Sequence, residues 1–256
     1  MPFNRVAKHR IKDLFFRSFG FLFRHSKPYK NWLEIKNISN SINFDSSRSF
    51  PNHWSVKAID LMSETYAQPP MEITRVVFVI HAYYPEVFGE ILSQLSREFS
   101  EAHPLLPKVY VSTTHESFDV VNTMLERSIF EFKIFEFENK GRDILPFLQV
   151  LKNMDDDGVM VVKIHTKRSN HRLTGSLWRK ELFDSLLTQK NIIKGVGFFN
   201  HNPNIGIIGP KGHIVPMSLY FGGNALALSF FCRAFGISAD VLKKLNFVAG
   251  SMFFAR

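Results

Sequence analysis

Short apolar runs alternate with segments of helical spacing along most of this chain, and that alternation constrains the fold more than any other feature. The runs are rich in β-branched and aromatic residues, as in RVVFVIHAYY (75–84). The segments between them repeat apolar residues every three or four positions, as in PEVFGEILSQLSREF (85–99). Strands that are joined by helices run parallel in one sheet, because a parallel pair needs a long crossover. The sequence therefore predicts an α/β fold, with an open and mostly parallel sheet flanked by helices.

The positions of the elements follow from the same pattern, and no internal repeat interrupts it. The main strands are expected at 75–84, 108–114, 132–139 and 157–167. The main helices are expected at 85–99, 117–128, 141–152 and 176–188. A short strand within 204–213 and a last strand at 246–256 are expected to complete the sheet.

The first 30 residues are strongly basic and rich in phenylalanine. They hold eight Lys or Arg against one acid, so most of the chain's formal charge of +9 lies here. Residues 11–24 mix phenylalanine and leucine with cations, a composition that suits a segment lying in a membrane interface. A helix that packs the same phenylalanines on the rest of the protein remains an alternative. A transmembrane helix needs about 18–20 apolar residues, which no stretch supplies, and the order of residues does not suit a cleaved signal peptide.

Residues 36–70 are rich in Ser, Asn and Pro and end at two adjacent prolines, which is typical of a connecting segment. We therefore expect residues 1–70 to form a basic, Phe-rich extension with a linker, and residues 71–256 to form the α/β domain. The single cysteine, Cys232, excludes an internal disulfide framework and fits a reducing cytoplasm. Nucleic acid is not expected as a partner, because little basic and aromatic patterning follows residue 30.

Polar side chains stand where each of the four main strands ends. They are His81, Tyr83 and Tyr84; Ser112, Thr113 and Thr114; Asn139, Gly141, Arg142 and Asp143; and Lys163, His165, Thr166 and Lys167. In an open parallel sheet, ligands bind in the crevice at the carboxyl ends of the strands. Four polar strand ends in register therefore predict a pocket for an anionic, hydroxylated ligand.

The hexapeptide ENKGRD (138–143) has two interpretations. Gly141 permits a tight turn, and Arg142 at the start of a helix suits a phosphate or diphosphate. An ordinary turn, with Asp143 as the helix cap, explains the same residues.

Lys163 lies inside a strand pattern, with His165 on the same face, so it calls for a buried anion. A hydrogen-bonded core histidine remains an alternative for His165. Zinc is not expected, because His165, His171 and His213 lack a recognisable ligand spacing.

A series of uncommon motifs occurs in order over roughly residues 75–256: HAYYPE, ENKGRDILPFL, VVKIHTKRSNHR, NPNIGIIGPKGH, YFGGN and FVAGSMFFAR. Together they resemble the bacterial rhamnan synthesis protein F family, which is found in polysaccharide assembly clusters. The resemblance implies a Rossmann-like fold of the GT-A type and an inverting glycosyltransferase. Its donor would be a nucleotide sugar such as dTDP-rhamnose or GDP-rhamnose. The acceptor would be a lipid-linked glycan of O-antigen (lipopolysaccharide), capsule or rhamnan, reached from the cytoplasmic side, peripherally on the plasma membrane.

The resemblance also implies roles for particular residues. Many GT-A enzymes hold a divalent metal with D-x-D at the end of the fourth strand, where this chain has K-I-H-T-K. No cofactor or metal is therefore expected to be required. Lys163, Lys167 and Arg142 would act as fixed cations on the diphosphate, with hydrogen bonds from Thr166 and His165.

Three further groups complete the expected site. His81, Tyr83, Thr113, Asn139 and Gly141 would line the nucleotide side, Gly223 and Asn224 the sugar or acceptor side, and Gly250 and Ser251 the strand beneath the donor sugar. Members of the family usually continue beyond FVAGSMFFAR into a helical region with acidic residues, so a truncated domain is expected here. Asp143 and His165 are then the only candidates for the general base. A catalytically inactive nucleotide-binding or assembly module is the alternative.

Overall fold

The structure is a computed structural model that describes residues 5–30, 32–33, 71–166, 175–217, 224–238, 241 and 244–256. The chain forms two compact units. The first, here called the sheet unit, comprises Pro69–Lys211 and Gly250–Arg256. The second, here called the N-terminal unit, comprises Met1–Gln68 and Gly212–Ala249. The sequence interpretation placed residues 212–249 in the α/β domain, whereas the structure groups them with the N-terminal residues.

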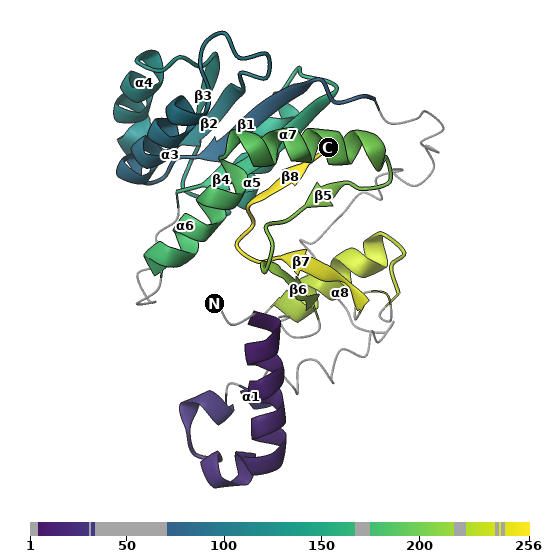
Figure 1. Ribbon diagram of the computed structural model, residues 1–256. Helices are drawn as coiled ribbons and strands as arrows, with labels where there is room; N and C mark the ends of the chain where they lie inside the picture. Colours follow the sequence, from purple (N-terminus) through teal and green to yellow (C-terminus); the bar gives the residue numbers. More distant parts are fainter. Residues whose placement is uncertain are drawn as a thin grey trace. The chain divides into compact units, whose positions relative to one another are not determined.

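The sheet unit is built on a six-stranded sheet with the order β3-β2-β1-β4-β8-β5 (Figure 1). Its strands are β1 (Arg75–His81), β2 (Lys108–Thr113), β3 (Phe132–Glu136), β4 (Val159–His165), β5 (Ile207–Ile208) and β8 (Phe253–Ala255). Strands β1 to β4 pair in parallel, and β8 is antiparallel to both β4 and β5. Every strand except β8 therefore runs in the same direction, which confirms the predicted α/β fold with a mostly parallel sheet.

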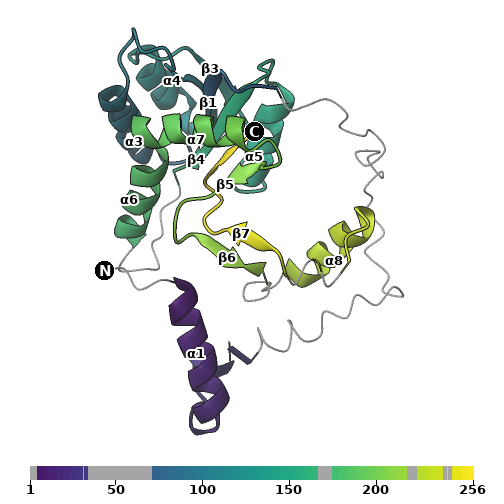
Figure 2. The ribbon, with the colours of Figure 1, turned by 45° about the vertical axis from the view of Figure 1, so that its right-hand side comes forward.

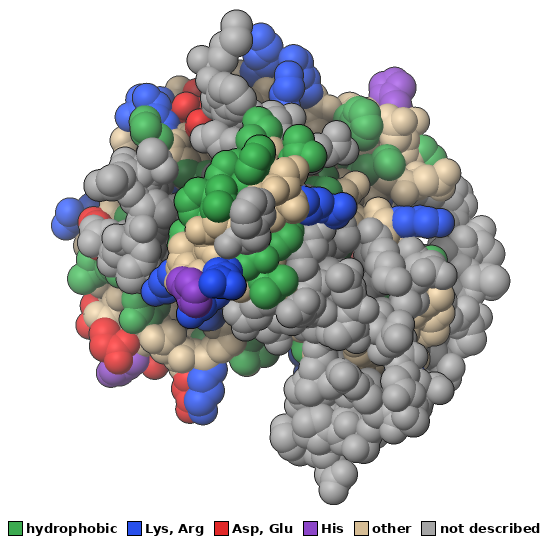
Figure 3. Space-filling view, turned by 90° about the horizontal axis from the view of Figure 1, so that it is seen from below, with side chains coloured by type: hydrophobic (Ala, Val, Ile, Leu, Met, Phe, Trp, Pro, Cys, Tyr) green, Lys and Arg blue, Asp and Glu red, His purple; other side chains and the backbone are tan. Residues whose placement is uncertain are grey.

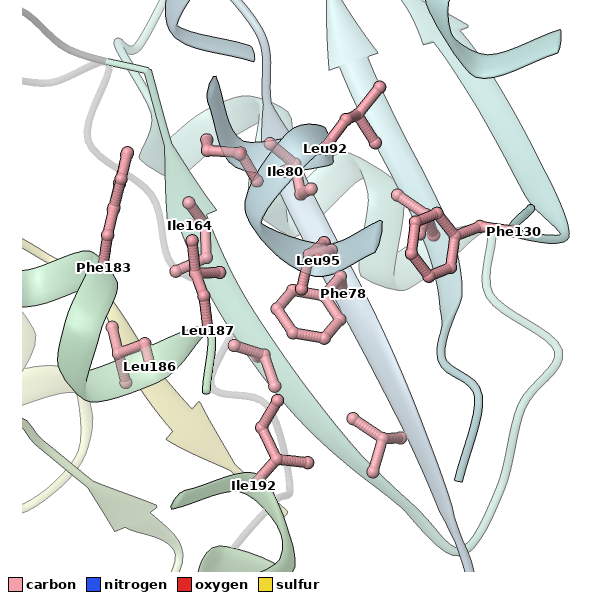
Figure 4. Close-up of a cluster of buried hydrophobic side chains, with 14 of the residues drawn as sticks. Phe78, Ile80, Leu92, Leu95, Phe130, Ile164, Phe183, Leu186, Leu187 and Ile192 are labelled. Atoms are coloured by element: carbon pink, nitrogen blue, oxygen red, sulfur yellow. The ribbon is translucent and has the colours of Figure 1, made fainter. Parts of the chain in front are cut away.

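Helices cover both faces of this sheet (Figure 2). They are α3 (Pro85–Glu98), α4 (Phe118–Glu126, preceded by the short 3-10 helix η3, His115–Ser117), α5 (Ile144–Lys152), α6 (Gly175–Leu186) and α7 (Gln189–His201). Residues of α3, α4, α6 and α7 share one core cluster with the sheet, which Figure 4 shows in part. Residues of α5 share a second, smaller cluster with the opposite face.

Alternation along β1 explains why two cores form. Phe78 and Ile80 point into the larger cluster, whereas Val77 and Val79 point into the cluster beneath α5. Strands that are buried on both faces read as continuous apolar runs, which is the pattern that the sequence carries. Helix α3 follows β1 with Pro85 in its first turn and buries one apolar stripe against the sheet.

The prediction of a single last strand at residues 246–256 is wrong, because the structure has two strands there. β7 (Asn246–Val248) and β8 belong to different sheets. Between them Gly250 has φ 95° and Ser251 has φ 47°, both in the left-handed region that ends an extended strand. The apolar pattern continues across this break, so hydrophobicity alone cannot reveal it.

The N-terminal unit contains α1 (Arg5–Phe19), the 3-10 helix η1 (Gly20–Phe23), α8 (Ala225–Ala234) and a two-stranded sheet of β6 (Ile214–Pro216) and β7. The two strands pair antiparallel, with Val215 opposite Phe247. Among the residues that the structure describes, no helix combines the length and the apolar character needed to cross a membrane.

A polar network closes the sheet at the end where the strands begin. Arg75 Nη1 lies 2.9 Å from Asp156 Oδ1, and the Tyr110 hydroxyl donates a 2.5 Å hydrogen bond to Asp156 Oδ2. The Asp156 side chain is only 8% exposed, so its charge depends on these donors. The network lies at the edge opposite the polar strand ends, which indicates a structural role.

Tyr110→Phe should therefore lower the free energy of unfolding by about 1–2 kcal/mol, because Asp156 loses a buried donor. Urea unfolding followed by circular dichroism measures this change. Tyr83→Phe is the matched control: its ring is partly exposed and its hydroxyl accepts one long 3.4 Å hydrogen bond, so a change below about 0.5 kcal/mol is expected. Equal losses in both variants would contradict the assigned role of Asp156.

Candidate functional site

Three strand ends meet at the point where the strand order of the sheet reverses. β2 and then β3 lie on one side of β1, whereas the crossover that follows β3 brings β4 to the other side of β1. His81 at the end of β1 stands opposite Ser112 of β2 and His165 of β4. In open α/β sheets, this switch point is where ligands bind. Three of the four polar strand ends that were predicted to lie together are thus neighbours in the sheet.

Lys163 is buried beneath this edge and is paired with a carboxylate. Its Nζ lies 2.6 Å from Asp143 Oδ2 and 2.7 Å from the backbone oxygen of Ser251, and its side chain is 1% exposed. The rings of Phe147 and Phe253 lie 5.2 and 5.7 Å from the ammonium group. Lys163 therefore has the buried anion that its strand position calls for, and that anion is Asp143.

Asp143 also holds the turn that leads into β8. The Ser251 hydroxyl donates a 2.8 Å hydrogen bond to Asp143 Oδ2, and His165 Nε2 lies 2.8 Å from the backbone oxygen of Gly250. His165 Nε2 is 4.0 Å from Asp143 Oδ2. We call His81, Asp143, Lys163, His165 and Ser251 the Asp143 cluster. It joins the ends of β1 and β4, the start of α5 and the turn before β8.

The charges of the cluster follow from burial and from its partners. Burial alone would raise the pKa of Asp143, but the nearby His165 and Lys163 and the hydrogen bonds from Lys163 and Ser251 outweigh it and lower that pKa to about 2. Burial, aided by Lys163 and opposed by Asp143 and a hydrogen bond at Ser112, lowers the pKa of His81. At neutral pH the cluster thus contains an ionised Asp143 and a neutral His81, whose Nδ1 lies 3.0 Å from Ser112 Oγ.

The loop before α5 is a left-handed turn. Gly141 has φ 68° and Arg142 has φ 55°, and a Cβ on Gly141 would collide with Leu145. Asp143 precedes α5 but makes no side-chain capping hydrogen bond, so the capping interpretation was wrong. Its carboxylate instead reaches Lys163 and Ser251. Arg142 is exposed beside it.

Two predicted threonines bind backbone groups. Thr113 Oγ1 donates to the backbone oxygen of Ala82, and Thr166 Oγ1 donates to that of His81 and accepts from the backbone N–H of Tyr84. These hydrogen bonds fix the path of the chain directly after β1. Thr113 and Thr166 therefore position the site and do not offer their hydroxyls to a ligand in this arrangement.

Tyr83 and Asn139 form a second, exposed group at the same edge. Asn139 Nδ2 donates a 3.4 Å hydrogen bond to the Tyr83 hydroxyl, and the Tyr83 ring packs edge-to-face on Tyr84 at 4.9 Å. Tyr83 is 37% exposed. An exposed aromatic ring beside an amide suits a planar, polar ligand group.

Three predicted site residues do not belong to the described part of the sheet unit. Lys167 and Gly223 lie outside the residues that the structure describes. Asn224 directly precedes α8 in the N-terminal unit and is exposed.

A divalent cation does not fit the Asp143 cluster. The lysine ammonium already binds the one carboxylate of the cluster, at 2.6 Å. Throughout the described ranges, no three His, Cys, Asp or Glu side chains come together in a way that could hold a metal ion.

Sequence reasoning missed one hydrogen bond of the cluster and three rings that pack on it. Ser112 binds His81, the rings of Phe147 and Phe253 enclose Lys163, and Trp178 lies under Gly250, where a Cβ would come within 2.7 Å of its ring. Ser112 itself was predicted at this edge, because it lies near the end of the second strand, but its contact with His81 was not predicted. The ring contacts depend on α5, α6 and β8 folding over the sheet, which no local pattern encodes.

The strand order and the polar cluster at the switch point define the chain as a doubly wound α/β protein with a candidate ligand site at the carboxyl edge of its sheet. Comparison with known families makes the assignment more particular. The family model described as rhamnan synthesis protein F matches residues 23–247, so the chain belongs to this family. Membership associates the chain with polysaccharide synthesis.

Two curated relatives are similar to this chain. Both are the uncharacterized protein WxcX, from strains B100 and ATCC 33913 of Xanthomonas campestris pv. campestris. Each is 35% identical over 179 residues, which is 70% of this chain and 25% of the relative. The chain thus spans about a quarter of the length of the curated relatives it matches.

Among solved structures, the chain is similar to 4-diphosphocytidyl-2C-methyl-D-erythritol synthase from Anaerococcus prevotii. The identity is 14%, the coverage is 52% of this chain and 54% of the other, and the TM-score is 0.29. A similarity of this size supports no conclusion about function.

Proposed function

We propose that this chain is a glycosyltransferase that moves a deoxyhexose such as rhamnose from a nucleotide-diphosphate donor to a growing cell-surface polysaccharide. The observation that carries the proposal is the register of His81 with His165 at the switch point, where His165 Nε2 lies 4.0 Å from the carboxylate of the Asp143–Lys163 pair. The family's link to polysaccharide synthesis supplies the reaction class. The acceptor would be a lipid-linked glycan at the cytoplasmic face of the plasma membrane.

Glycosyl transfer builds negative charge on the departing diphosphate, which fixed cations can stabilise. Arg142 is exposed at the start of α5, and the first backbone N–H groups of that helix add partial positive charge. We assign the diphosphate to this place, with Lys167 as a second cation from the segment that follows β4. Tyr83 and Asn139 would hold the nucleoside beside it.

The geometry changes the role that we propose for Lys163. Its ammonium is 1% exposed and is bound by Asp143 and the Ser251 backbone oxygen, so it would act on the donor through Asp143. Asp143 in turn is 14% exposed and accessible to a donor hydroxyl. With a pKa of about 2 it is a weak base, whereas an effective general base has a pKa near the working pH. We therefore assign Asp143 to donor positioning and not to removal of the acceptor proton.

The second candidate function is a catalytically silent nucleotide-binding or assembly module. The burial of Lys163 and His165, at 1% and 2% exposure, favours it, because both side chains already bind groups of the protein. The two candidate functions differ in whether the carboxyl edge of the sheet binds a nucleotide sugar and whether the chain transfers the sugar.

Calorimetric titration of the purified chain with dTDP, GDP and UDP, with Mg²⁺ or with EDTA, tests the proposal. One nucleotide is expected to bind in EDTA as well as in Mg²⁺, because the assigned diphosphate site relies on protein cations. Arg142→Ala should weaken this binding by about tenfold or more, since a charge-assisted contact is lost. Incubation of the preferred nucleotide sugar with a lipid-linked acceptor then separates a transferase from a silent module.

Lys140→Ala is the matched control for Arg142→Ala. Lys140 belongs to the same loop and has the same charge, but it is exposed and paired with Glu138. Its removal should leave nucleotide affinity unchanged. Absence of binding to all three nucleotides, or equal losses in the two variants, would contradict the assigned diphosphate site.

A further inference from the structure

The start of the N-terminal unit folds into a helical hairpin that keeps an apolar face uncovered. Helix α1 runs to Phe19, η1 turns the chain, and Ser26 Oγ accepts a hydrogen bond from the Tyr29 backbone N–H at the start of a second helical segment. The hairpin has its own interior: the Phe16 ring lies 5.6 Å from both Tyr29 and Trp32. A Cβ on Gly20 would collide with Tyr29, so the two arms pack closely.

The uncovered face, here called the hairpin face, consists of six apolar residues that are 41% to 67% exposed: Ile11, Leu14, Phe15, Phe19, Leu22 and Phe23. They recur every three or four positions, which places them on one stripe of α1 and its continuation. Phe15 lies 5.7 Å from Phe19 and 5.4 Å from Phe23, so the rings form one cluster. Phe16, in contrast, is buried in the interior of the hairpin.

Cations border the hairpin face. Five exposed Lys or Arg side chains occur within the same segment: Lys12, Arg17, Arg24, Lys27 and Lys30. The first 30 residues of the sequence contain a single acid, Asp13. Figure 3 looks onto the end of the hairpin that lies lowest in Figure 1 and shows hydrophobic side chains beside Lys and Arg side chains. An acidic surface with an apolar layer beneath it complements this arrangement.

We infer that the hairpin face is an interfacial anchor that inserts its phenylalanines into the headgroup region of an anionic bilayer. Apolar insertion and attraction to anionic lipid act together in such helices, and neither alone usually gives stable binding. A 15-residue α1 is about 22 Å long, shorter than the hydrocarbon core of a bilayer, so it would lie along the interface. The inference goes beyond glycosyl transfer, because it needs no nucleotide and no acceptor.

Sedimentation of the full chain with vesicles tests the anchor. We expect binding to vesicles that contain phosphatidylglycerol, weaker binding to pure phosphatidylcholine, and loss of binding as salt rises. Phe15→Ser combined with Phe19→Ser should weaken binding about tenfold or more, because the inserted rings are lost. The interior residues Phe16, Tyr29 and Trp32 stay in place, and helix content is checked by circular dichroism.

Ile193→Ser combined with Phe198→Ser is the matched control, since these residues of α7 are 47% and 49% exposed in the sheet unit. This variant should bind vesicles as the unchanged chain does. Equal binding to both lipids, or an unchanged affinity of the Phe15 and Phe19 variant, would overturn the anchor. A third outcome would also overturn the anchor: the unchanged chain does not bind vesicles but self-associates in sedimentation velocity, and the Phe15 and Phe19 variant loses this self-association. Nucleotide affinity should be the same in all variants, which separates failure of the anchor from failure of the proposed transferase.

Discussion

Asp143→Asn is expected to lower the free energy of unfolding by about 3–5 kcal/mol and to abolish donor binding, because the buried Lys163 ammonium loses its counter-ion. Urea unfolding of the unchanged chain and of the variant at neutral pH measures the first effect. Calorimetric titration with the preferred nucleotide measures the second. Removal of one partner of a buried ion pair costs more than removal of both, because the remaining charge is left unpaired.

The double variant Asp143→Leu with Lys163→Met therefore tests the ion pair, because it removes both charges. It should recover much of the lost stability while donor binding stays absent. The exposed pair of Lys133 and Asp155, at 3.6 Å, gives the surface control: Asp155→Asn should leave stability unchanged. A double variant that is as unstable as Asp143→Asn would contradict the pairing, and normal nucleotide binding in it would contradict the assigned role of Asp143.

The stability difference between the unchanged chain and Asp143→Asn should depend on pH in a defined direction. The pKa of Asp143 is lowered from 3.8 to about 2 in the folded chain, so its carboxylate stabilises the fold at pH values above about 4. This contribution is lost as the pH falls from about 4 toward 2. The stability difference between the unchanged chain and Asp143→Asn should thus be constant near neutral pH and shrink below about pH 4. Urea unfolding at several pH values measures it.

Gly250→Ala is expected to lower the free energy of unfolding by about 2–4 kcal/mol. Gly250 has φ 95°, which side-chain-bearing residues adopt at a cost of about 1–2 kcal/mol. The added Cβ would also lie 2.7 Å from Trp178 Cζ2, so the ring or the turn must move. Because the backbone oxygen of Gly250 accepts from His165, and that of Ser251 accepts from Lys163, the shift should also weaken donor binding. Urea unfolding and nucleotide titration measure the two effects.

Gly197→Ala is the control for that substitution. Gly197 lies in α7, and an added Cβ would meet nothing within 4 Å, so a gain of about 0.5–1 kcal/mol is expected. A double-mutant cycle with Trp178→Leu isolates the steric part, since the smaller side chain leaves room for the methyl group. If Gly250→Ala and Gly197→Ala had the same effect, the close contact with Trp178 would not constrain the turn.

The sheet could be predicted from the sequence because its strands are buried on both faces. Runs such as residues 76–80 are apolar throughout, and each is followed by a segment of helical spacing, so both the strand type and the crossover could be predicted. The last strand could not be predicted correctly. Gly250 and Ser251 break it by backbone conformation, while the apolar pattern continues on both sides.

The sequence could predict which residues lie at the candidate site, but not which of them contact one another. His81, His165 and Asp143 could be assigned to one edge, because each ends a strand or follows one, and Lys163 could be placed inside the strand that His165 ends. The sequence could not show that Lys163 points to Asp143, since 20 residues separate them and the contact depends on how α5 crosses the sheet. For the same reason Lys163 was assigned directly to a ligand, whereas its ammonium is enclosed by Asp143, Ser251 and two phenyl rings.

The antiparallel pairing of β8 with β5 makes the stretch of chain between these two strands tolerant of changes in length. Ile207 and Ile208 of β5 pair with Ala255 and Phe254 of β8, so the whole intervening stretch is, topologically, the loop of one long hairpin. The entropy of closing such a loop grows only with the logarithm of its length. Evolution can therefore lengthen, shorten or replace residues 209–249, before the turn at Gly250 and Ser251, while the two strands keep their register. We expect family members to differ most in length within this stretch, and recombinant exchange of it between them to leave the six-stranded framework folded.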